Sequence, residues 1–370
     1  MAYHRKLGLD RHSFERIRDN DFVEDDADGT PMQRLPDYHN RLERGTVLIE
    51  GTVVRGFPKV PRTLVLEEGI SRYFDGEVVV EEKMDGYNVR LARIDGEILA
   101  FTRSGLVCPF TTHEARRMLE PEAFFDAHSD LMLCVEMVGP ENPYTAHDYD
   151  DVDSLEPRVF DVRDRESGVP LAVEERRDLV EDHGFPQVPL LGRYDLHEAP
   201  DGVDDAIRAL DEEDREGVVM KSVDGDRQLK YTTSAANQGD LAYAFSMPFD
   251  YGRDFMFRRL LREAFQAHER GEDGKTFDDR AAAVGEAVLE PMRDAIATVD
   301  EGGVVGERHT VRAAPRVVEA LLDHLREQHV ALEVERDERE DGDRVVTFLK
   351  RVQSTNDSIR AYLDGQAVRH

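Results

Sequence analysis

The sequence of 370 residues contains no tryptophan and only two cysteines, Cys108 and Cys134. Two cysteines are too few for a disulfide framework, and their spacing matches no set of metal ligands. The reducing cytoplasm is therefore the expected compartment. No apolar run is long enough to cross a membrane, and the first residues lack the apolar core of a secretory signal. We expect neither a disulfide-stapled secreted domain nor a membrane partner.

Lysine is also scarce, with seven lysines against 41 arginines in a chain of net charge −31. Such a charge argues against nucleic acid as a partner, because phosphate binding normally needs a cationic surface. The carboxylates are spread among apolar residues through the whole chain, which disfavours a disordered acidic tail. This composition resembles that of proteins from salt-loving organisms, where molar salt shortens the Debye length to about 3 Å. We expect a halophilic protein in which local cations decide what binds.

The length and the mean hydropathy of −0.57 predict a globular chain of two or three domains with a real core. Residues 1–45 are polar and predict an irregular segment. Residues 46–54 predict a pair of strands around Gly51. Residues 55–64 are punctuated by proline and predict a loop with a positively charged end.

Short runs rich in β-branched residues dominate residues 76–233. Hairpin turns are predicted at Asp95-Gly96 and at Asp224-Gly225. Helical periodicity interrupts the strands at residues 112–127 and at residues 172–184, the second ending at a glycine. The pattern indicates antiparallel sheets with flanking helices.

Helical patterns follow from about residue 237 onward. Helices are predicted at 252–271, 280–299, 314–329 and 354–365, with a hairpin at 331–352. One face of the first helix is apolar, and it consists of Phe257, Leu260, Leu261, Ala264 and Phe265. The apolar faces of the helices predicted at 252–271 and 280–299 have a larger area than a pair of helices on a small domain would bury. They predict a homodimer interface, and an intramolecular core is the alternative.

Lys83 is the most informative lysine. It ends the run Val78–Lys83 and precedes Asp85-Gly86, where glycine permits close approach of a ligand or of the backbone. A lysine in such a place can act as a nucleophile if its amine is partly deprotonated. A surface lysine before a turn is the ordinary alternative, and the short motif alone does not decide between them.

Further candidates follow in chain order within β-type segments. They are Arg103 in "FTRSG", Glu136 in "CVEMVGPENPY", Phe160 in "RVFDVRD", Glu216 and Lys221 at the ends of "EGVVMK", and Lys230 in "QLKYTT". Taken singly, Phe160 fits a core position and Glu136 fits a satisfied structural carboxylate. Taken together and in this order, they predict a nucleotide site.

This ordered set resembles the covalent nucleotidyltransferase superfamily of ATP-dependent DNA and RNA ligases and mRNA capping enzymes. The resemblance spans residues 76–235. It implies that Lys83 takes the AMP, and that residues near it bind ATP with Mg²⁺ or Mn²⁺. The other roles that it implies are ribose contact by Glu136, purine stacking by Phe160, metal and phosphate contact by Glu216, α-phosphate contact by Lys221 and Lys230, and further cofactor contacts by Glu82, Asn88 and Arg103.

Within the superfamily, "KMDGYNVR" is closer to RNA ligases, because DNA ligases and capping enzymes usually have arginine where Asn88 stands. With "RGFPK" upstream and the helical region downstream, the chain resembles archaeal homodimeric ATP-dependent RNA ligases. One departure concerns the motif that is Lys-x-Lys in many ligases, which here is "KYT". Lys230 must therefore act with Lys221, or Arg227 helps, and the assignment of lysines to phosphates stays open.

The resemblance implies an α+β fold. We expect a β-containing extension at 1–64, a nucleotidyltransferase domain at 65–236, a helical dimerisation module at 237–305 and a small α+β module at 306–370. The expected function is joining of single-stranded RNA ends, including circularisation. A DNA ligase or a capping-type guanylyltransferase is the alternative enzyme, and an RNA-binding scaffold without catalysis is the alternative of another class.

Overall fold

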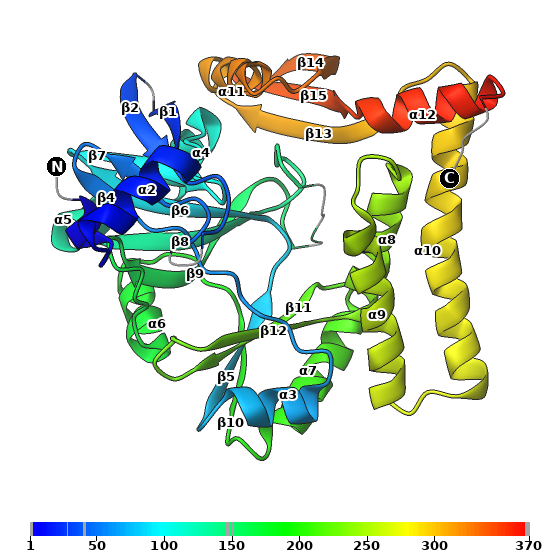
Figure 1. Ribbon diagram of the computed structural model, residues 1–370, viewed down its shortest axis with the longest axis horizontal. Helices are drawn as coiled ribbons and strands as arrows, with labels where there is room; N and C mark the ends of the chain where they lie inside the picture. The colour runs from blue at the N-terminus through cyan, green and yellow to red at the C-terminus, as the bar shows by residue number, and fades with distance from the viewer. Residues whose placement is uncertain (1–2, 28, 40–41, 146–148, 150, 367–370) are drawn as a thin grey trace.

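The computed structural model describes residues 3–27, 29–39, 42–145, 149 and 151–366. Antiparallel sheets and helices alternate along the chain (Figure 1), so the predicted mixed α and β character is confirmed. None of the helices in this described part combines the length and the apolar character that a membrane span needs.

The prediction of an irregular segment at residues 1–45 is wrong. This part of the chain has two helices, and it supplies two strands to a sheet of order β1-β2-β3-β4. The elements are α1 Tyr3–Lys6, α2 Arg11–Asp21, β1 Val23–Ala27, β2 Thr30–Arg34, β3 Val47–Ile49 and β4 Thr52–Val54. Helix α2 forms because Asp10 caps it by accepting a hydrogen bond from Ser13 N. Its buried Phe14 and Ile17 pack against Leu48 and Val53 of the sheet.

Two four-stranded antiparallel sheets form the middle of the molecule. One has the order β10-β5-β11-β12 and the other the order β7-β6-β8-β9. The strands are β5 Val78–Lys83, β6 Tyr87–Ile94, β7 Glu97–Thr102, β8 Leu131–Val138, β9 Glu156–Asp164, β10 Leu190–Tyr194, β11 Gly217–Ser222 and β12 Gln228–Thr232. Both predicted hairpins are confirmed, since β6 pairs with β7 and β11 pairs with β12.

Helices cover the outer faces of these sheets. They are α3 Leu66–Tyr73, α4 Pro109–Leu119, α5 Glu122–Ala127, α6 Val173–Asp182 and α7 Ala199–Glu212. Helices α3 and α7 pack on the face of the first sheet that carries Val78, Val80 and Val218. The single helical segment predicted at 112–127 is two helices, because Glu120 adopts the left-handed conformation (φ 47°) and Pro121 follows it.

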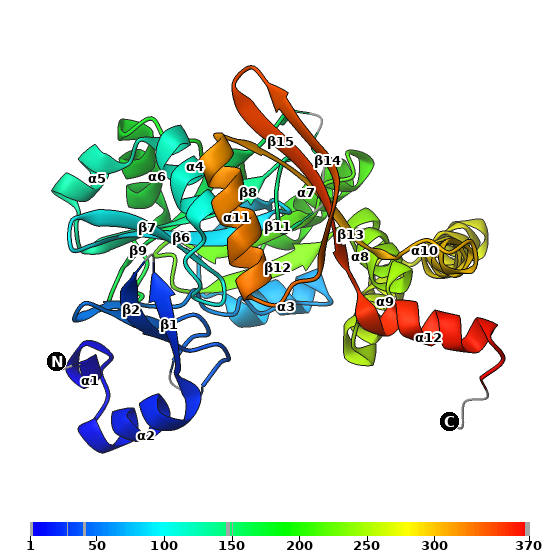
Figure 2. The ribbon, with the colours of Figure 1, turned by 90° about the horizontal axis from the view of Figure 1, so that it is seen from above.

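The last third of the chain begins with the helices α8, α9 and α10 and ends with a second α+β unit (Figures 1 and 2). The elements are α8 Ser234–Ser246, α9 Arg253–Glu269, α10 Gly274–Asp300, β13 Gly306–Ala313, α11 Pro315–Glu327, β14 Leu332–Glu340, β15 Asp343–Arg351 and α12 Gln353–Leu363. The hairpin and the four predicted helices are confirmed. Helix α10 continues through Pro291, and β13 adds a strand that the sequence did not indicate.

The terminal unit packs back onto the middle of the molecule. Helix α11 contacts α4, and Val318, Leu321 and Phe348 belong to the same core cluster as Val89 and Leu133 of the β6–β8 sheet. This shared core fixes Gln328, at the end of α11, against the cleft described next.

Candidate active site

A cleft of about 930 Å³ lies between the two central sheets and the N-terminal segment. Most of the residues predicted for the cofactor line it, and Glu216 lies beside it in contact with one of them. The predicted residues at its wall are Glu82, Lys83, Asn88, Arg103, Glu136, Phe160, Lys221 and Lys230. Residues from sheets distant in sequence therefore converge on one cavity.

Lys83 reaches this cleft because of the alternation of β5. Val78 and Val80 point into the core beneath α3 and α7, so Lys83 points to the opposite face. The strand ends there because Gly86 brings the chain against β8, where a Cβ atom would lie 2.3 Å from the carbonyl oxygen of Met137. The close approach that the Asp-Gly pair predicts is thus made by the backbone.

Glu216 faces Lys83 from the neighbouring strand. It precedes Gly217, which pairs with Lys83 in the β5–β11 register. The Lys83 amine and the Glu216 carboxylate form an ion pair in which the two side chains are 23% and 17% exposed. The lysine and the acid that the sequence predicts for the phosphates are therefore partners.

Three carboxylates, those of Glu216, Glu136 and Asp85, act on the positive charge of Lys83. Burial raises the pKa of Glu136 to about 8 and that of Asp85 to about 7, and in each case the negative charge of Glu216 adds to the effect. Burial lowers the pKa of Lys83, but the carboxylates of Glu216 and Glu136 outweigh it and leave that pKa above its usual value. In the free protein Lys83 is consequently held as a cation, and its amine must lose a proton before it can attack.

Lys230 lies closer to this pair than Lys221 does. In the paired strands Lys230 is opposite Val219, and Val219 is opposite Glu81, two residues before Lys83. Lys221 is four residues beyond Gly217, about 13 Å along the strand at roughly 3.3 Å per residue. Burial and the positive charge of Lys83 lower the pKa of Lys230 to about 7.

Lys221 instead belongs to a buried network at the other end of the cleft. Its amine donates to the carbonyl oxygen of Phe160 at 2.6 Å and lies 3.0 Å from the Glu81 carboxylate. Glu81 also pairs with Arg176 and with Arg177. Lys221 therefore fixes β9 and Phe160 in place, and Lys230 is the predicted lysine beside the Lys83–Glu216 pair.

Phe160 presents a partly buried ring at the cleft. The ring of Phe57 meets it edge to face, with 5.1 Å between the ring centroids and 82° between the planes. Met84 and Val188 also pack near Phe160. The arrangement provides an apolar, aromatic surface of the kind that a purine base needs.

Asn88 and Glu136 are opposite each other in the β6–β8 register, and both line the cleft. The buried side-chain oxygen of Asn88 has no hydrogen-bond partner among the described residues, so it is available to a ligand that donates a proton. Arg103 follows β7 and is exposed to the cleft. Glu82 also lines the cleft, and its carboxylate lies 3.5 Å from the guanidinium of Arg215.

Sequence reasoning missed several residues of the site. Phe57 supports Phe160, Asp85 adds a carboxylate beside Lys83, and Tyr38, Arg44 and Gln328 also line the cleft. Phe57 and Asp85 stand in the quoted motifs "RGFPK" and "KMDGYNVR", so the signal for them was present. Gln328 comes from a distant helix and carries no local signal.

The carboxylates around Lys83 suit a hard divalent cation, because Mg²⁺ prefers oxygen ligands. Among the described residues no three His, Cys, Asp or Glu side chains are arranged to hold a metal ion by themselves. Mg²⁺ is commonly held by one or two carboxylates together with substrate phosphates rather than by an all-protein cage. The residues present therefore fit a metal that binds together with a nucleotide.

The family model described as RNA ligase matches residues 76–232, and the model described as the C-terminal region of ligase Pab1020 matches residues 243–366. The uncharacterized protein MJ0414 of Methanocaldococcus jannaschii is 38% identical over 337 residues, and the match covers 88% of this chain and 85% of that protein.

A solved archaeal ATP-dependent RNA ligase is 39% identical, with a TM-score of 0.92 and coverage of 100% of both chains. A protein of Aquifex aeolicus, provisionally called an ATP-dependent DNA ligase, is 27% identical with a TM-score of 0.89, over 97% of this chain and 99% of that one. The fold is therefore that of a ligase nucleotidyltransferase. The chain belongs to the family of archaeal ATP-dependent RNA ligases.

Proposed function

We infer that the protein joins RNA 5′-phosphate and 3′-hydroxyl ends at the expense of ATP. The observation that carries this inference is the Lys83–Glu216 pair at the end of β5, in the cleft of a chain that matches an archaeal ATP-dependent RNA ligase over its whole length. The reaction has three steps, and this chain can circularise an RNA when both ends belong to one molecule.

In the first step the neutral amine of Lys83 attacks the α-phosphorus of ATP, a phosphorus–nitrogen bond forms, and pyrophosphate leaves. In the second step an oxygen of the RNA 5′-phosphate displaces the lysine and takes the AMP. In the third step the RNA 3′-hydroxyl attacks that 5′-phosphorus, and AMP leaves. Phe160 and Asn88 hold the nucleoside, Glu136 and Arg103 lie beside it, and Lys230 offsets phosphate charge.

Glu216 and the phosphate oxygens would hold a divalent cation, Mg²⁺ or Mn²⁺, which offsets the charge that develops on the leaving pyrophosphate. We also propose that the chain is divided into four domains, with boundaries after residues 64, 236 and 305. A reducing cytoplasm suits a chain whose two cysteines are free and buried.

Labelled nucleotides test the assignment. Incubation with ATP labelled at the α-phosphate should label the protein covalently, whereas labelled GTP should not. A capping-type guanylyltransferase would give the opposite result, and a scaffold would take neither label. The capping alternative is also disfavoured by the fold, because helices α8–α10 follow β12 where a capping enzyme would usually have an OB-fold barrel.

A homodimer is proposed for helices α9 and α10. Their outer faces carry large apolar side chains that are exposed, which are Phe257, Leu260, Phe265, Phe277, Leu289 and Ile296. The buried positions of α9 include Glu263 and Gln266 instead. A helix with its polar side inward and its apolar side outward is typical of an association surface.

Light scattering in high salt should therefore give about twice the chain mass of 42.1 kDa. The double variant Phe257→Asp, Leu289→Asp should give a monomer, because each new carboxylate would be buried at the interface. Val169→Asp, at an equally exposed apolar residue outside α9 and α10, is the matched control and should stay dimeric. A wild-type monomer at micromolar concentrations would refute the proposal.

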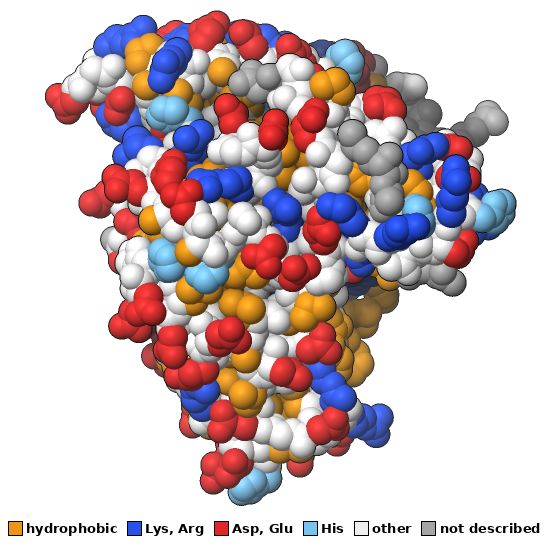
Figure 3. Space-filling model, turned by 90° about the vertical axis from the view of Figure 1, so that its left-hand side faces the viewer, with side chains coloured by type: hydrophobic (Ala, Val, Ile, Leu, Met, Phe, Trp, Pro, Cys, Tyr) orange, Lys and Arg blue, Asp and Glu red, His pale blue; other side chains and the backbone are white. Residues whose placement is uncertain are grey.

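RNA joining should rise with KCl from tens of millimolar to the molar range. Acidic side chains are scattered over the face shown in Figure 3, and the chain carries a net charge of −31. At low salt this charge repels RNA and strains the fold. The local cations at the cleft, including Lys59, Arg103 and Lys230, act at short range and are screened less.

Circular dichroism over the same salt titration separates the two causes. Activity that rises while the spectrum is constant reports reduced repulsion, and a spectrum that changes in parallel reports stabilisation of the fold. A protein that is fully folded in dilute buffer and whose joining falls steadily from the lowest salt would contradict the halophilic interpretation.

A further inference from the structure

Arg62, Arg259 and Arg262 form a second group of cations beside the Lys83–Glu216 pair. Arg62 comes from the loop that precedes α3, and the two other arginines come from the inner side of α9. A small crevice is lined by Arg62, Thr232 and Arg262. The proposed three-step reaction assigns no role to these three arginines.

The position of Arg62 is fixed by β12. Its backbone forms a parallel bridge with Lys230, supported by hydrogen bonds from Lys230 N to Pro61 O (3.0 Å) and from Thr63 N to Lys230 O (3.2 Å). Its guanidinium donates to the hydroxyl of Thr232 at 2.6 Å. Thr232 occupies the position at which many ligases have the second lysine of Lys-x-Lys. Arg62 therefore brings a positive charge to a place where strand β12 has no second lysine.

Arg262 joins the same network from the other side. Thr232 donates to the side-chain oxygen of Asn237 at 2.9 Å, and Arg262 donates to that oxygen at 3.3 Å. Thr232 is opposite Gly217 in the register, directly after Glu216. A continuous set of contacts therefore connects Arg262 and Arg62 with the strand that carries Glu216.

Arg62 and Arg262 have little negative charge within ion-pair distance, whereas Arg259 is paired with Asp240. Asp240 lies 2.8 Å from Arg259 and 3.8 Å from Arg262, and no carboxylate in the described part of the chain forms an ion pair with Arg62. Burial, together with the neighbouring arginines, lowers the pKa of Arg62 to about 10 and that of Arg262 to about 9, although the carboxylates of Glu216 and Asp240 oppose the shift. A partly buried excess of positive charge is costly without an anion.

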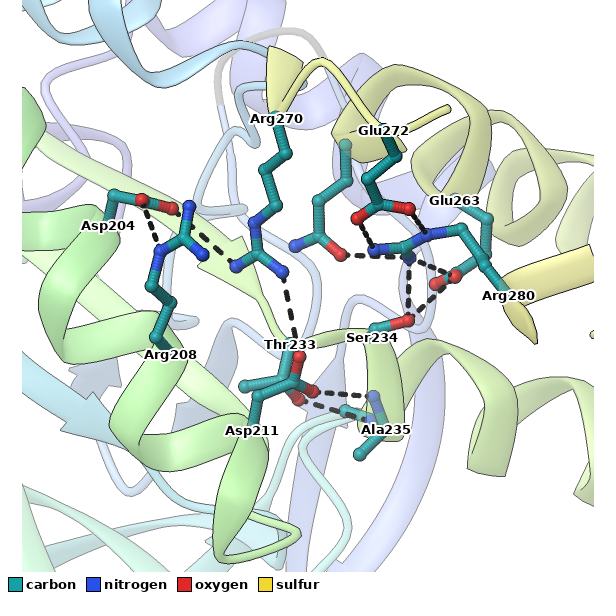
Figure 4. A network of polar contacts seen from close by, with 12 residues as sticks. Asp204, Arg208, Asp211, Thr233, Ser234, Ala235, Glu263, Arg270, Glu272 and Arg280 are labelled. Carbon is teal, nitrogen blue, oxygen red and sulfur yellow. Dashed lines mark hydrogen bonds and ion pairs between the residues drawn. The ribbon is translucent and has the colours of Figure 1, made fainter. Parts of the chain in front are cut away.

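Arg280, a neighbouring arginine, is instead matched by two carboxylates (Figure 4). Arg280 of α10 pairs with Glu272 and with Glu263, each at 2.6 Å, and also donates to Ser234. Arg270, after α9, lies 3.5 Å from Asp204 and 3.8 Å from Asp211. These contacts connect α9 with α7, α8 and α10, and so help to fix the helix that carries Arg259 and Arg262.

We propose that Arg62, Arg259 and Arg262 bind a phosphate group other than the α-phosphate of ATP. The proposal rests on the ligase function given above. Two phosphates pass close to Lys83 in that reaction: the terminal phosphate of the RNA 5′ end and the pyrophosphate that leaves ATP. Guanidinium groups suit either one, because their planar N–H donors match phosphate oxygens.

Binding of inorganic pyrophosphate to the full chain provides a test that needs no catalysis. In calorimetry in molar KCl, Arg62→Gln and Arg262→Gln should each weaken binding about tenfold, a typical loss for one charge-assisted hydrogen bond. Arg62→Lys should retain most of the affinity and shows that the fold tolerates a change there. Arg258→Gln, at an outward position of α9 that is 62% exposed, is the matched control and should bind as the wild type does.

The two half-reactions identify the phosphate. If it is the RNA 5′-phosphate, formation of Lys83–AMP in the variants stays within about twofold of wild type, while AMP transfer to 5′-phosphorylated RNA falls about tenfold. If it is pyrophosphate, formation of Lys83–AMP falls instead. Wild-type pyrophosphate affinity together with wild-type rates in both half-reactions would overturn the proposal. A wild-type protein that forms no AMP adduct, yet binds pyrophosphate through Arg62 and Arg262, would overturn the ligase function and leave the anion site standing.

Discussion

Lys83→Arg should eliminate the covalent AMP adduct completely. After incubation with ATP and Mg²⁺, intact-mass analysis of the wild type should show one added AMP, which peptide mapping places on Lys83. A guanidinium keeps its proton at any pH that the protein tolerates, so it supplies no lone pair for attack on phosphorus. It also keeps the positive charge that pairs with Glu216, so the loss cannot be attributed to an unpaired carboxylate.

Lys275→Arg is the matched control for this change. Lys275 is 86% exposed and pairs with Asp279 on the surface of α10, so its variant should be adenylylated like the wild type. An adduct that persists in Lys83→Arg would show that another residue is the nucleophile.

Glu216→Gln should slow adenylylation by about two orders of magnitude, comparable to the loss of one strong electrostatic contact in a catalytic site. Two effects of the substitution oppose each other. Removal of the carboxylate lowers the pKa of Lys83, since Glu216 raises it, and this alone would make the amine more reactive. Removal also deprives the phosphates and their cation of an oxygen ligand. We expect the second effect to dominate.

The pH dependence of adenylylation separates these effects. In the wild type the rate should rise with pH through the neutral and alkaline range, because the neutral fraction of a lysine with a raised pKa increases about tenfold per pH unit. In Glu216→Gln the rise should begin at lower pH, while the plateau stays far below that of the wild type. Glu213→Gln, at a side chain that is 67% exposed, should behave like the wild type. A variant as fast as the wild type at its plateau would exclude Glu216 from phosphate and metal binding.

Local sequence pattern was most informative about which candidate residues stand at the ends of strands. Lys83 ends one β-branched run and Glu216 directly precedes another, so their placement at strand ends could be predicted from local pattern. Their direct pairing could not, because it depends on the register of β5 with β11 across more than 130 residues of chain. The different positions of Lys221 and Lys230 depend on the same register.

Local pattern does not reveal strand β1 or the meeting of the three arginines, although it does contain a signal for helix α2. Strand β1, with the sequence "VEDDA", is mostly acidic and exposed, so it has no apolar alternation to reveal it. Helix α2 did have a signal, since Asp10 can cap it and Phe14 and Ile17 share one face. The group of Arg62, Arg259 and Arg262 joins segments almost 200 residues apart, and nothing in either segment alone indicates that they meet.

The most direct test of the central claim compares RNA with DNA. Single strands of RNA and DNA of the same sequence, and a nicked DNA duplex, each with a labelled 5′-phosphate and a 3′-hydroxyl, are incubated with ATP and Mg²⁺ in molar KCl. The RNA label should become resistant to phosphatase, with one AMP released for each bond formed, and the product should disappear in Lys83→Arg. RNA that stays unjoined while a nicked DNA duplex is sealed would contradict the assignment and would identify a DNA ligase.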